Sequence, residues 1–244
     1  MKIEMLGVTI DNIDRSQVMD QVASYAQSDR AHLIVTVNPE FIMQAQHDDE
    51  FRHILNHADI AVADGFGITL AARRFGFRLK QRIPGIDLLM DIAAFAARTG
   101  RRVYLLGARR GVAARTAAVL VKQYPELHIV GAESGYRHWH RPIPDKKLIR
   151  MISAARPDIL FVAFGQVKQE KWLYHHLPLL PSVRVAMGVG GSFDYISGKI
   201  RRAPRWMRKL GLEWLFRLLR QPWRFSRIVT AVIRFSIAVA RSNH

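Results

Sequence analysis

Short apolar runs alternate with helix-length amphipathic segments through the first 200 residues, and this alternation limits the fold classes that the chain can adopt. The runs are almost continuously apolar, as in parallel strands that helices cover on both faces. The expected strands are His32–Val37, Ile60–Ala63, Val103–Leu106, His128–Val130, Ile159–Ala163 and Val183–Met187. The expected helices are Arg15–Ala26, Glu40–His57, Ile86–Arg98, Val112–Gln123, Lys146–Ala155 and Glu170–His176. The pattern predicts an α/β fold with a mostly parallel, open sheet and helices on both faces.

Two segments lie outside this alternation. Ile3–Ile10 is short and apolar, and it predicts a strand or hairpin at an edge of the sheet. His138–Asp145 contains two prolines, which argue against regular structure there.

The chain carries a formal net charge of +17, which points to an anionic partner such as a phosphate, a nucleic acid or a membrane surface. From Arg201 to His244, eleven Lys and Arg stand against the single acid Glu213. A change of composition this large marks a boundary near residue 200. We therefore expect an α/β domain over residues 1–198 and a basic, amphipathic, helical appendage over residues 199–244.

The arginines of the appendage recur at spacings that place them on one helical face. They are Arg217, Arg220, Arg224, Arg227, Arg234 and Arg241. Pro222 should interrupt the helix after Gln221. The Trp, Phe and Leu residues between the arginines favour a helix that lies in a membrane interface. Nucleic-acid binding and simple packing on the core are the alternatives, but no recognition-helix, RRM or zinc-finger pattern supports nucleic acid.

Two further observations concern the location of the protein. No apolar run reaches the ~18–20 residues that a membrane-spanning helix needs. The first residues include acids and lack the apolar core of a secretory signal. We therefore expect a cytoplasmic protein that lies peripherally on the inner face of the cell membrane.

Open α/β sheets bind ligands at the carboxyl ends of their strands. Five such ends carry small, polar or acidic residues in this chain. They are Thr36–Pro39, Ala63–Gly65, Leu106–Ala108, Phe164–Gln166 and Gly188–Gly191. A single glycine there can simply make the turn into the next helix. Five such ends together favour a pocket for a polar ligand.

Residues and motifs that the chain lacks exclude several kinds of chemistry. There is no cysteine, hence no thiol nucleophile, disulfide or Cys-ligated metal. There is no P-loop, and the clusters that begin at Gly107 and Gly188 do not complete a dinucleotide fingerprint. The ten histidines form no HExxH motif, and no DxD motif is present. We therefore expect no cofactor and no metal, so arginines and helix N-termini would neutralise a bound nucleotide diphosphate.

Asp64 is the acidic residue with the most informative position. It follows the apolar run Ile60–Ala63 and precedes Gly65, so its side chain should project from a strand end into the pocket. An apolar rim raises the pKa of a carboxyl toward the range of a general base. Asp is also a favoured N-cap for a helix that follows a strand. Position alone leaves both interpretations open.

A series of short motifs is more specific in its order and spacing than any one motif alone. The motifs are Thr36–Glu40, Ala63–Gly65, Gln81–Asp87, Leu106–Gly107, Gly135–Tyr136, Lys168–Glu170, Gly188–Asp194, Arg202–Pro204 and Leu212–Leu218. Together they resemble the WecG/TagA/CpsF family of bacterial glycosyltransferases over nearly the whole chain. The resemblance implies a Rossmann-like catalytic domain and a C-terminal appendage that completes the active site.

The resemblance also implies an activity. Members of the family are inverting, membrane-associated enzymes that transfer a sugar, commonly N-acetylmannosamine or its uronic acid, from a UDP-sugar. The acceptor is a polyprenyl-diphosphate-linked sugar, and the products enter teichoic acid, common antigen, capsule or exopolysaccharide synthesis. The partners implied are therefore the UDP-sugar donor, the lipid-linked acceptor and an anionic membrane surface.

Residue roles carry over where the motifs match. Asp64 matches the proposed catalytic base. The residues that match substrate-holding positions are Thr36, Asn38, Arg82, Gln169, Arg202, Arg217 and Arg224. The nucleotide is expected on Gly107, Tyr136, Gly188, Gly190, Gly191 and Asp194. The chain departs from the family at Gln166-Val167, where members have a small residue and proline, and in a longer loop over His138–Asp145.

Two other functions stay open at this point. A basic peripheral protein could bind a nucleotide sugar or a lipid without turnover, and an RNA-binding α/β domain is the weaker alternative. The sequence names neither the donor sugar, the acceptor sugar nor the polysaccharide pathway, and it leaves homo-oligomerisation open.

Overall fold

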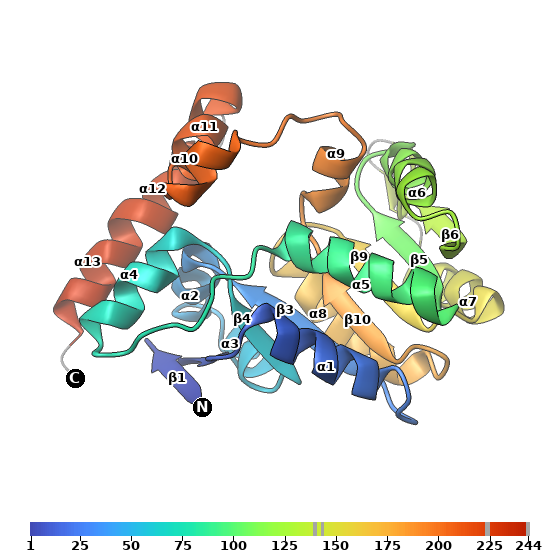
Figure 1. The fold of residues 1–244 in the computed structure, drawn as a ribbon, viewed down its shortest axis with the longest axis horizontal. Coiled ribbons are helices and arrows are strands. Elements are labelled where there is room, and N and C mark those ends of the chain that lie inside the picture. The colour runs from blue at the N-terminus through green and yellow to red at the C-terminus, as the bar shows by residue number, and fades with distance from the viewer. Residues whose placement is uncertain (139–140, 143, 223–224, 243–244) are drawn as a thin grey trace.

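Six strands pair in parallel to form the central sheet of the molecule (Figure 1). They are β3 (His32–Val37), β4 (Ile60–Ala63), β5 (Arg102–Gly107), β6 (His128–Glu133), β9 (Ile159–Ala163) and β10 (Val185–Gly188). Their order across the sheet is β4-β3-β10-β9-β5-β6, which confirms the predicted open, parallel α/β fold. The structure is a computed structural model, and it describes residues 1–138, 141–142, 144–222 and 225–242.

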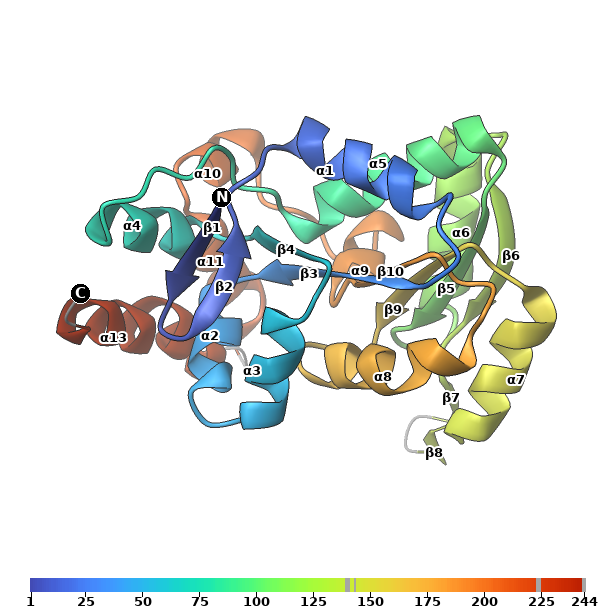
Figure 2. The same ribbon diagram turned by 90° about the horizontal axis from the view of Figure 1, so that it is seen from below.

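Helices cover both faces of this sheet (Figure 2). One face carries α1 (Arg15–Tyr25), α5 (Gly85–Thr99) and α6 (Val112–Gln123). The other carries α2 (Pro39–Ala45), α3 (Asp49–Asn56), α7 (Asp145–Ala155) and α8 (Lys168–His176). Within β3, Val35 belongs to one hydrophobic core and Ile34 to the other. Because helices bury both faces, every position of the strand is apolar or buried, which explains the continuous runs in the sequence.

The predicted helix over Glu40–His57 is wrong in one respect, because the segment forms two helices. Helix α2 ends at Ala45, and Asp48 starts α3 by accepting a hydrogen bond from the Phe51 amide, 3.0 Å away. Apolar residues recur at helical spacing on both sides of this break, so a prediction from periodicity alone treats the two helices as one. The aspartate cap is the local signal that separates them.

Two helices were not predicted, α4 (Phe66–Arg74) and α9 (Ser192–Ile196). Both follow glycine-rich strand ends, which favour a turn in a sequence-based prediction. Gly65 adopts a φ of +108°, a conformation that glycine alone takes readily, and the chain then turns directly into α4.

The segments outside the alternation form two small hairpins. Strands β1 (Lys2–Met5) and β2 (Val8–Asp11) pair as an antiparallel hairpin of their own, as expected for Ile3–Ile10. It contacts β4 through Asp11, whose carboxylate accepts the Ala61 amide at 2.8 Å. The expectation of irregular structure over His138–Asp145 is wrong in part, because β7 (Tyr136–His138) pairs with β8 (Arg141–Pro142).

The C-terminal appendage is helical, as predicted. It contains α10 (Arg205–Lys209), α11 (Glu213–Arg220), α12 (Phe225–Val229), the π-helix η3 (Thr230–Arg234) and α13 (Phe235–Arg241). Helix α11 ends before Gln221, where Pro222 was expected to interrupt it. Helix α13 packs against α2 and α4, and its Phe235 and Val239 are buried in the same core as α2 (Figure 1). The appendage therefore lies beside the sheet edge that carries β4 and β3.

Candidate active site

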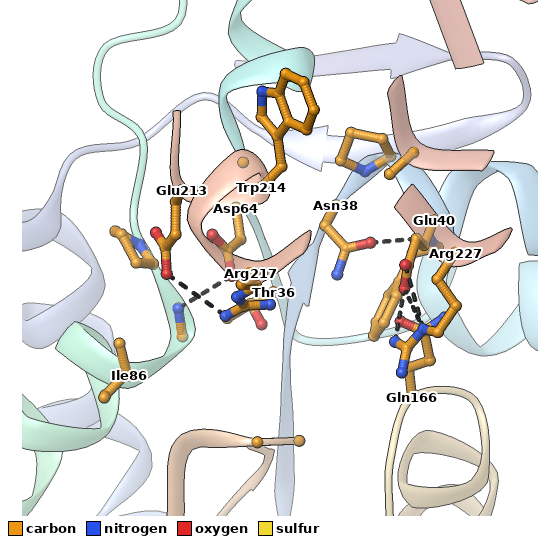
Figure 3. A pocket seen from close by; sticks show the side chains of 18 of the residues that line it. Thr36, Asn38, Glu40, Asp64, Ile86, Gln166, Glu213, Trp214, Arg217 and Arg227 are labelled. Atoms are coloured by element: carbon orange, nitrogen blue, oxygen red, sulfur yellow. Dashed lines mark hydrogen bonds and ion pairs between the residues drawn. The ribbon is translucent and has the colours of Figure 1, made fainter. Parts of the chain in front are cut away.

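A cavity of about 400 Å³ lies at the carboxyl ends of four neighbouring strands, β4, β3, β10 and β9. Residues that follow these strands form one side of it, and residues of α11, α12 and η3 form the other. Figure 3 shows Asp64, Glu213 and Arg217 together on one side of the cavity and Glu40 with Arg227 on the other. The cavity is thus the ligand position that the architecture favours, closed by the appendage.

Most of the residues predicted to form the site do line this cavity. They are Thr36, Asn38, Asp64, Arg82, Gln169, Gly188, Gly190, Gly191, Asp194 and Arg217. They come from six separate segments of the chain, which the fold brings together around one cavity.

Other predicted site residues have different positions. Arg202 forms a two-pronged ion pair with Asp87 of α5, at 2.5 and 2.9 Å, and does not line the cavity. Gly107, at the end of β5, is also outside the lining, and a Cβ there would lie 2.7 Å from the Ala163 carbonyl of β9. Tyr136 begins β7, and its side chain and the whole of Arg224 lie outside the described residues.

Asp64 follows β4 directly and is partly accessible to the cavity. Its carboxylate accepts a hydrogen bond from the Gly85 amide at the start of α5, with an N–O distance of 3.3 Å. Gly65, and not Asp64, is the N-cap of α4, and no side chain caps that helix. The N-cap interpretation of Asp64 is therefore wrong for the helix that follows it, and its side chain faces the cavity.

The surroundings of Asp64 set its affinity for a proton. The pKa of Asp64 is raised to about 6, mainly by burial and in smaller part by the nearby Glu213 carboxylate. The Gly85 amide, Arg217 and Arg82 lower the pKa, so the final value is a balance of these opposing effects. A carboxyl with this pKa is mostly ionised at neutral pH and is still basic enough to accept a proton from a substrate.

Arginines from both parts of the chain surround the same cavity. Arg217 lies over the Tyr195 ring, 5.3 Å from its centroid, and is 3.5 Å from Glu213. Arg82 donates to the Arg208 carbonyl at 3.1 Å, which ties the loop before α5 to α10. The fork of arginine matches phosphate oxygens, so these side chains suit a diphosphate.

A buried amide and carboxyl pair supports the glycine turn after β10. The Gln169 side chain accepts the Gly190 amide at 2.9 Å and donates to the Glu170 carboxylate at 2.7 Å. Glu170 also accepts the Val167 amide at 2.7 Å, and burial raises its pKa to about 7. A Cβ at Gly188 would lie 2.4 Å from the Glu170 carboxylate, so only glycine fits there. Gln169 and Glu170 therefore hold the turns after β9 and β10 together.

The turn before α8 has an unusual backbone. Val167 adopts a φ of +70°, which is unfavourable for a β-branched residue. Proline, whose ring fixes φ near about −65°, cannot adopt this conformation and has no amide to donate to Glu170. The chain therefore departs from the family at a position whose backbone conformation proline cannot adopt. The neighbouring Gln166 lines the cavity.

Sequence reasoning missed several charged residues of this site. Glu40 accepts the Arg227 guanidinium at 2.7 Å, yet the two residues are 187 positions apart. Glu213 was noted as the lone acid of a basic tail and as part of a motif, and Glu170 as part of a motif, but neither was predicted as a site residue. Glu170 had a local signal, since the side chain of a Glu at the third position of a helix typically accepts a hydrogen bond from the backbone amide of the N-cap residue. The Glu40–Arg227 pair had none, because it depends on how α12 lies against α2.

An ionisable carboxyl at the carboxyl edge of a parallel sheet, next to arginines, is an arrangement that suits group transfer from a phosphorylated donor. The model of the Glycosyl transferase WecG/TagA/CpsF family matches residues 3–244, and the chain belongs to this family. The protein is therefore a glycosyltransferase, and family membership favours an enzyme over the non-catalytic and RNA-binding alternatives.

Characterised relatives are similar over most of their length. A protein of Bacillus subtilis (strain 168) is 34% identical over 212 residues, which cover 86% of this chain and 80% of the relative. One of Bacillus spizizenii is 33% identical, with 96% and 91% covered, and one of Staphylococcus aureus (strain MRSA252) is 32% identical, with 98% and 93% covered. All three are named N-acetylglucosaminyldiphosphoundecaprenol N-acetyl-beta-D-mannosaminyltransferase.

The pair of Gln169 and Glu170 leads to a prediction about stability. Glu170→Gln replaces one of two acceptor oxygens with an NH₂ group, which then faces a backbone or side-chain N–H. We expect the free energy of unfolding to fall by about 1–3 kcal/mol in urea titrations at about pH 8. Glu50→Gln, at a half-exposed carboxylate on α3, is the matched control and should leave the free energy of unfolding nearly unchanged. Equal losses in the two variants would contradict the supporting role of Glu170.

Proposed function

We propose that this protein transfers an N-acetylmannosamine-type sugar, or a related hexose or uronic acid, from a UDP-sugar to a polyprenyl-diphosphate-linked sugar. The product would serve cell-surface polysaccharide synthesis. The family supports glycosyl transfer, and the names of the relatives support the sugar and the acceptor. The observation that carries the mechanism is the raised pKa of Asp64 in a cavity that it shares with Arg82 and Arg217.

The proposed reaction is a single displacement. Asp64 accepts the proton of an acceptor hydroxyl while that oxygen attacks the anomeric carbon of the donor sugar. The bond between the anomeric carbon and the diphosphate oxygen breaks, and UDP leaves with the electron pair. Attack from the face opposite the leaving group inverts the anomeric configuration.

The leaving diphosphate gains negative charge as the bond breaks, and the site contains groups that oppose this charge. Arg82 and Arg217 line the cavity, and the Gly188–Gly191 turn lies beside them in the same lining. Positioned donors of this kind stabilise a developing charge without reorganisation. We infer that Gln169 contributes by holding this turn, since both ends of its side-chain amide are engaged in hydrogen bonds.

We also propose that catalysis needs no bound metal ion. The arginines support this, because they supply positive charge where other nucleotide-sugar enzymes use a divalent ion. Within the described ranges, no group of three His, Asp or Glu side chains is placed to hold a metal.

Chelation tests the metal proposal. We expect transfer to continue at an undiminished rate in excess EDTA, because arginines neutralise the diphosphate. The measurement is the initial rate with and without EDTA, followed by addition of Mg²⁺ or Mn²⁺. Loss of activity in EDTA that either ion restores would overturn the proposal.

Asp64→Asn tests the base. The amide is nearly the same shape but cannot accept the proton, so we expect turnover to fall by about 10²–10⁴-fold. In the wild type, kcat/KM should fall about tenfold per pH unit below pH 6, where Asp64 becomes protonated, and the residual activity of the variant should lack this dependence. Asp49→Asn, at an exposed position on α3, is the control. Near-normal transfer by a folded Asp64→Asn protein would reject the assignment.

We propose that the appendage attaches the protein to an anionic membrane, on its cytoplasmic face. Trp206 of α10 and Leu210, the residue that caps the end of this helix, are 59% and 61% accessible, and Arg205 is also exposed. Apolar side chains one turn apart beside a cation suit the boundary between lipid headgroups and acyl chains. No helix in the described part of the chain is long and apolar enough to cross a membrane.

Homo-oligomerisation stays a prediction.

Vesicle binding tests the membrane proposal. Replacing Trp206 and Leu210 together with Ser removes apolar surface that would enter the lipid, so we expect binding to anionic vesicles to weaken at least tenfold. Raised salt should weaken it further, since each nearby cation contributes about 1 kcal/mol. Co-sedimentation is the measurement. Equal binding of wild type and variant, or of neutral and anionic vesicles, would contradict the proposal.

A further inference from the structure

The cavity that Asp64 lines is also lined by apolar side chains of α4 and of the α12–η3 segment. Phe66 and Leu70 of α4, one turn apart, line it on one side although they are 39% and 50% exposed. Ile228, Ala231 and Val232, spaced along α12 and η3, line it on the other. We name these five residues the apolar walls.

Two hydroxyl groups near the wall residues of η3 donate their hydrogen bonds to backbone carbonyls. The Ser236 hydroxyl, which borders the cavity, donates to the Val232 carbonyl at 2.6 Å, and the Thr230 hydroxyl donates to the Ser226 carbonyl at 3.0 Å. Ala231 and Val232 belong to the π-helix η3, a helix form that occurs frequently at functional sites. A ligand at the walls would therefore contact mainly apolar atoms and few groups that can form hydrogen bonds.

Cationic side chains stand directly beside the apolar walls. Arg227 precedes Ile228 in α12 and lines the same cavity, and Arg217 lies on the side toward Asp64. A cavity lined by a carboxyl group, by arginines and by apolar side chains matches a ligand that carries a sugar, a diphosphate and a hydrocarbon chain.

We propose that the apolar walls bind the first isoprenoid units of the lipid-linked acceptor, so that its chain leaves the cavity between α4 and the α12–η3 segment. This inference rests on the proposed function and adds a position for the lipid chain. A sugar or a nucleobase is the poorer occupant, because its polar groups would lose hydrogen bonds to water without replacement. An isoprenoid chain loses none and gains from leaving water.

Two soluble acceptors that share the sugar diphosphate and differ in the esterifying group test the inference. They are methyl and farnesyl esters of N-acetylglucosaminyl diphosphate, used without vesicles and below the concentration at which the farnesyl ester aggregates. The measurement is the ratio of kcat/KM for the farnesyl ester to that for the methyl ester. We expect the wild type to favour the farnesyl ester by tenfold or more.

Substitutions in the apolar walls should reduce this preference. Leu70→Gln and Val232→Thr each place a polar group against the chain, and we expect the ratio to fall about tenfold. Leu179→Gln is the matched control, since Leu179 in the short helix η1 (Leu177–Leu179) is 55% exposed and outside the cavity. An unchanged ratio in both wall variants, or a wild type without preference, would overturn the inference.

A second measurement uses the unmodified protein. A farnesyl-type acceptor with a photoreactive group at the end of its chain should crosslink to residues 66–70 or 228–232, as read by peptide mass spectrometry. Crosslinks confined to other segments would overturn the inference even if a wall variant failed to fold. The two proposals fail in different ways. If neither ester accepts a sugar, the proposed function itself is contradicted.

Discussion

The attachment of the C-terminal helices to the sheet edge is the constraint on which the site depends. Arg202 pairs with Asp87 of α5, and Arg227 pairs with Glu40 of α2, so two ion pairs join the C-terminal segment to helices of the α/β domain. Phe235 adds apolar burial in the core shared with α2. Loss of one partner of a half-buried pair leaves a charge uncompensated, which makes these contacts specific to one position of the appendage.

The chemistry of Asp64 follows from that attachment. Its pKa is raised by burial and by Glu213, and lowered by Arg82 and Arg217. Glu213 and Arg217 both belong to α11, so the appendage contributes one group to each side of the balance. Two groups of this one helix therefore act on the pKa of Asp64 in opposite directions. The domain and the appendage form the site jointly.

The α/β pattern could be predicted because it is local. A strand that is buried on both faces needs a continuous apolar run, and His32–Val37 or Ile159–Ala163 satisfies this requirement without knowledge of the rest of the chain. Boundaries were less predictable where two signals compete. The break between α2 and α3 depends on a single cap at Asp48, and α4 begins directly after Gly65, where glycine also predicts a turn.

The sequence by itself determined that Asp64 stands at a strand end, because the apolar run before it can only be a buried strand and the glycine after it ends that strand. The tertiary structure alone decided which arginines face the cavity. Arg217 and Arg227 line it, whereas Arg202 pairs with Asp87 outside the lining, although the motif match treats Arg202 and Arg217 alike. The reason is physical: strand burial depends on neighbours in the chain, but the partner of a charge depends on how distant helices pack.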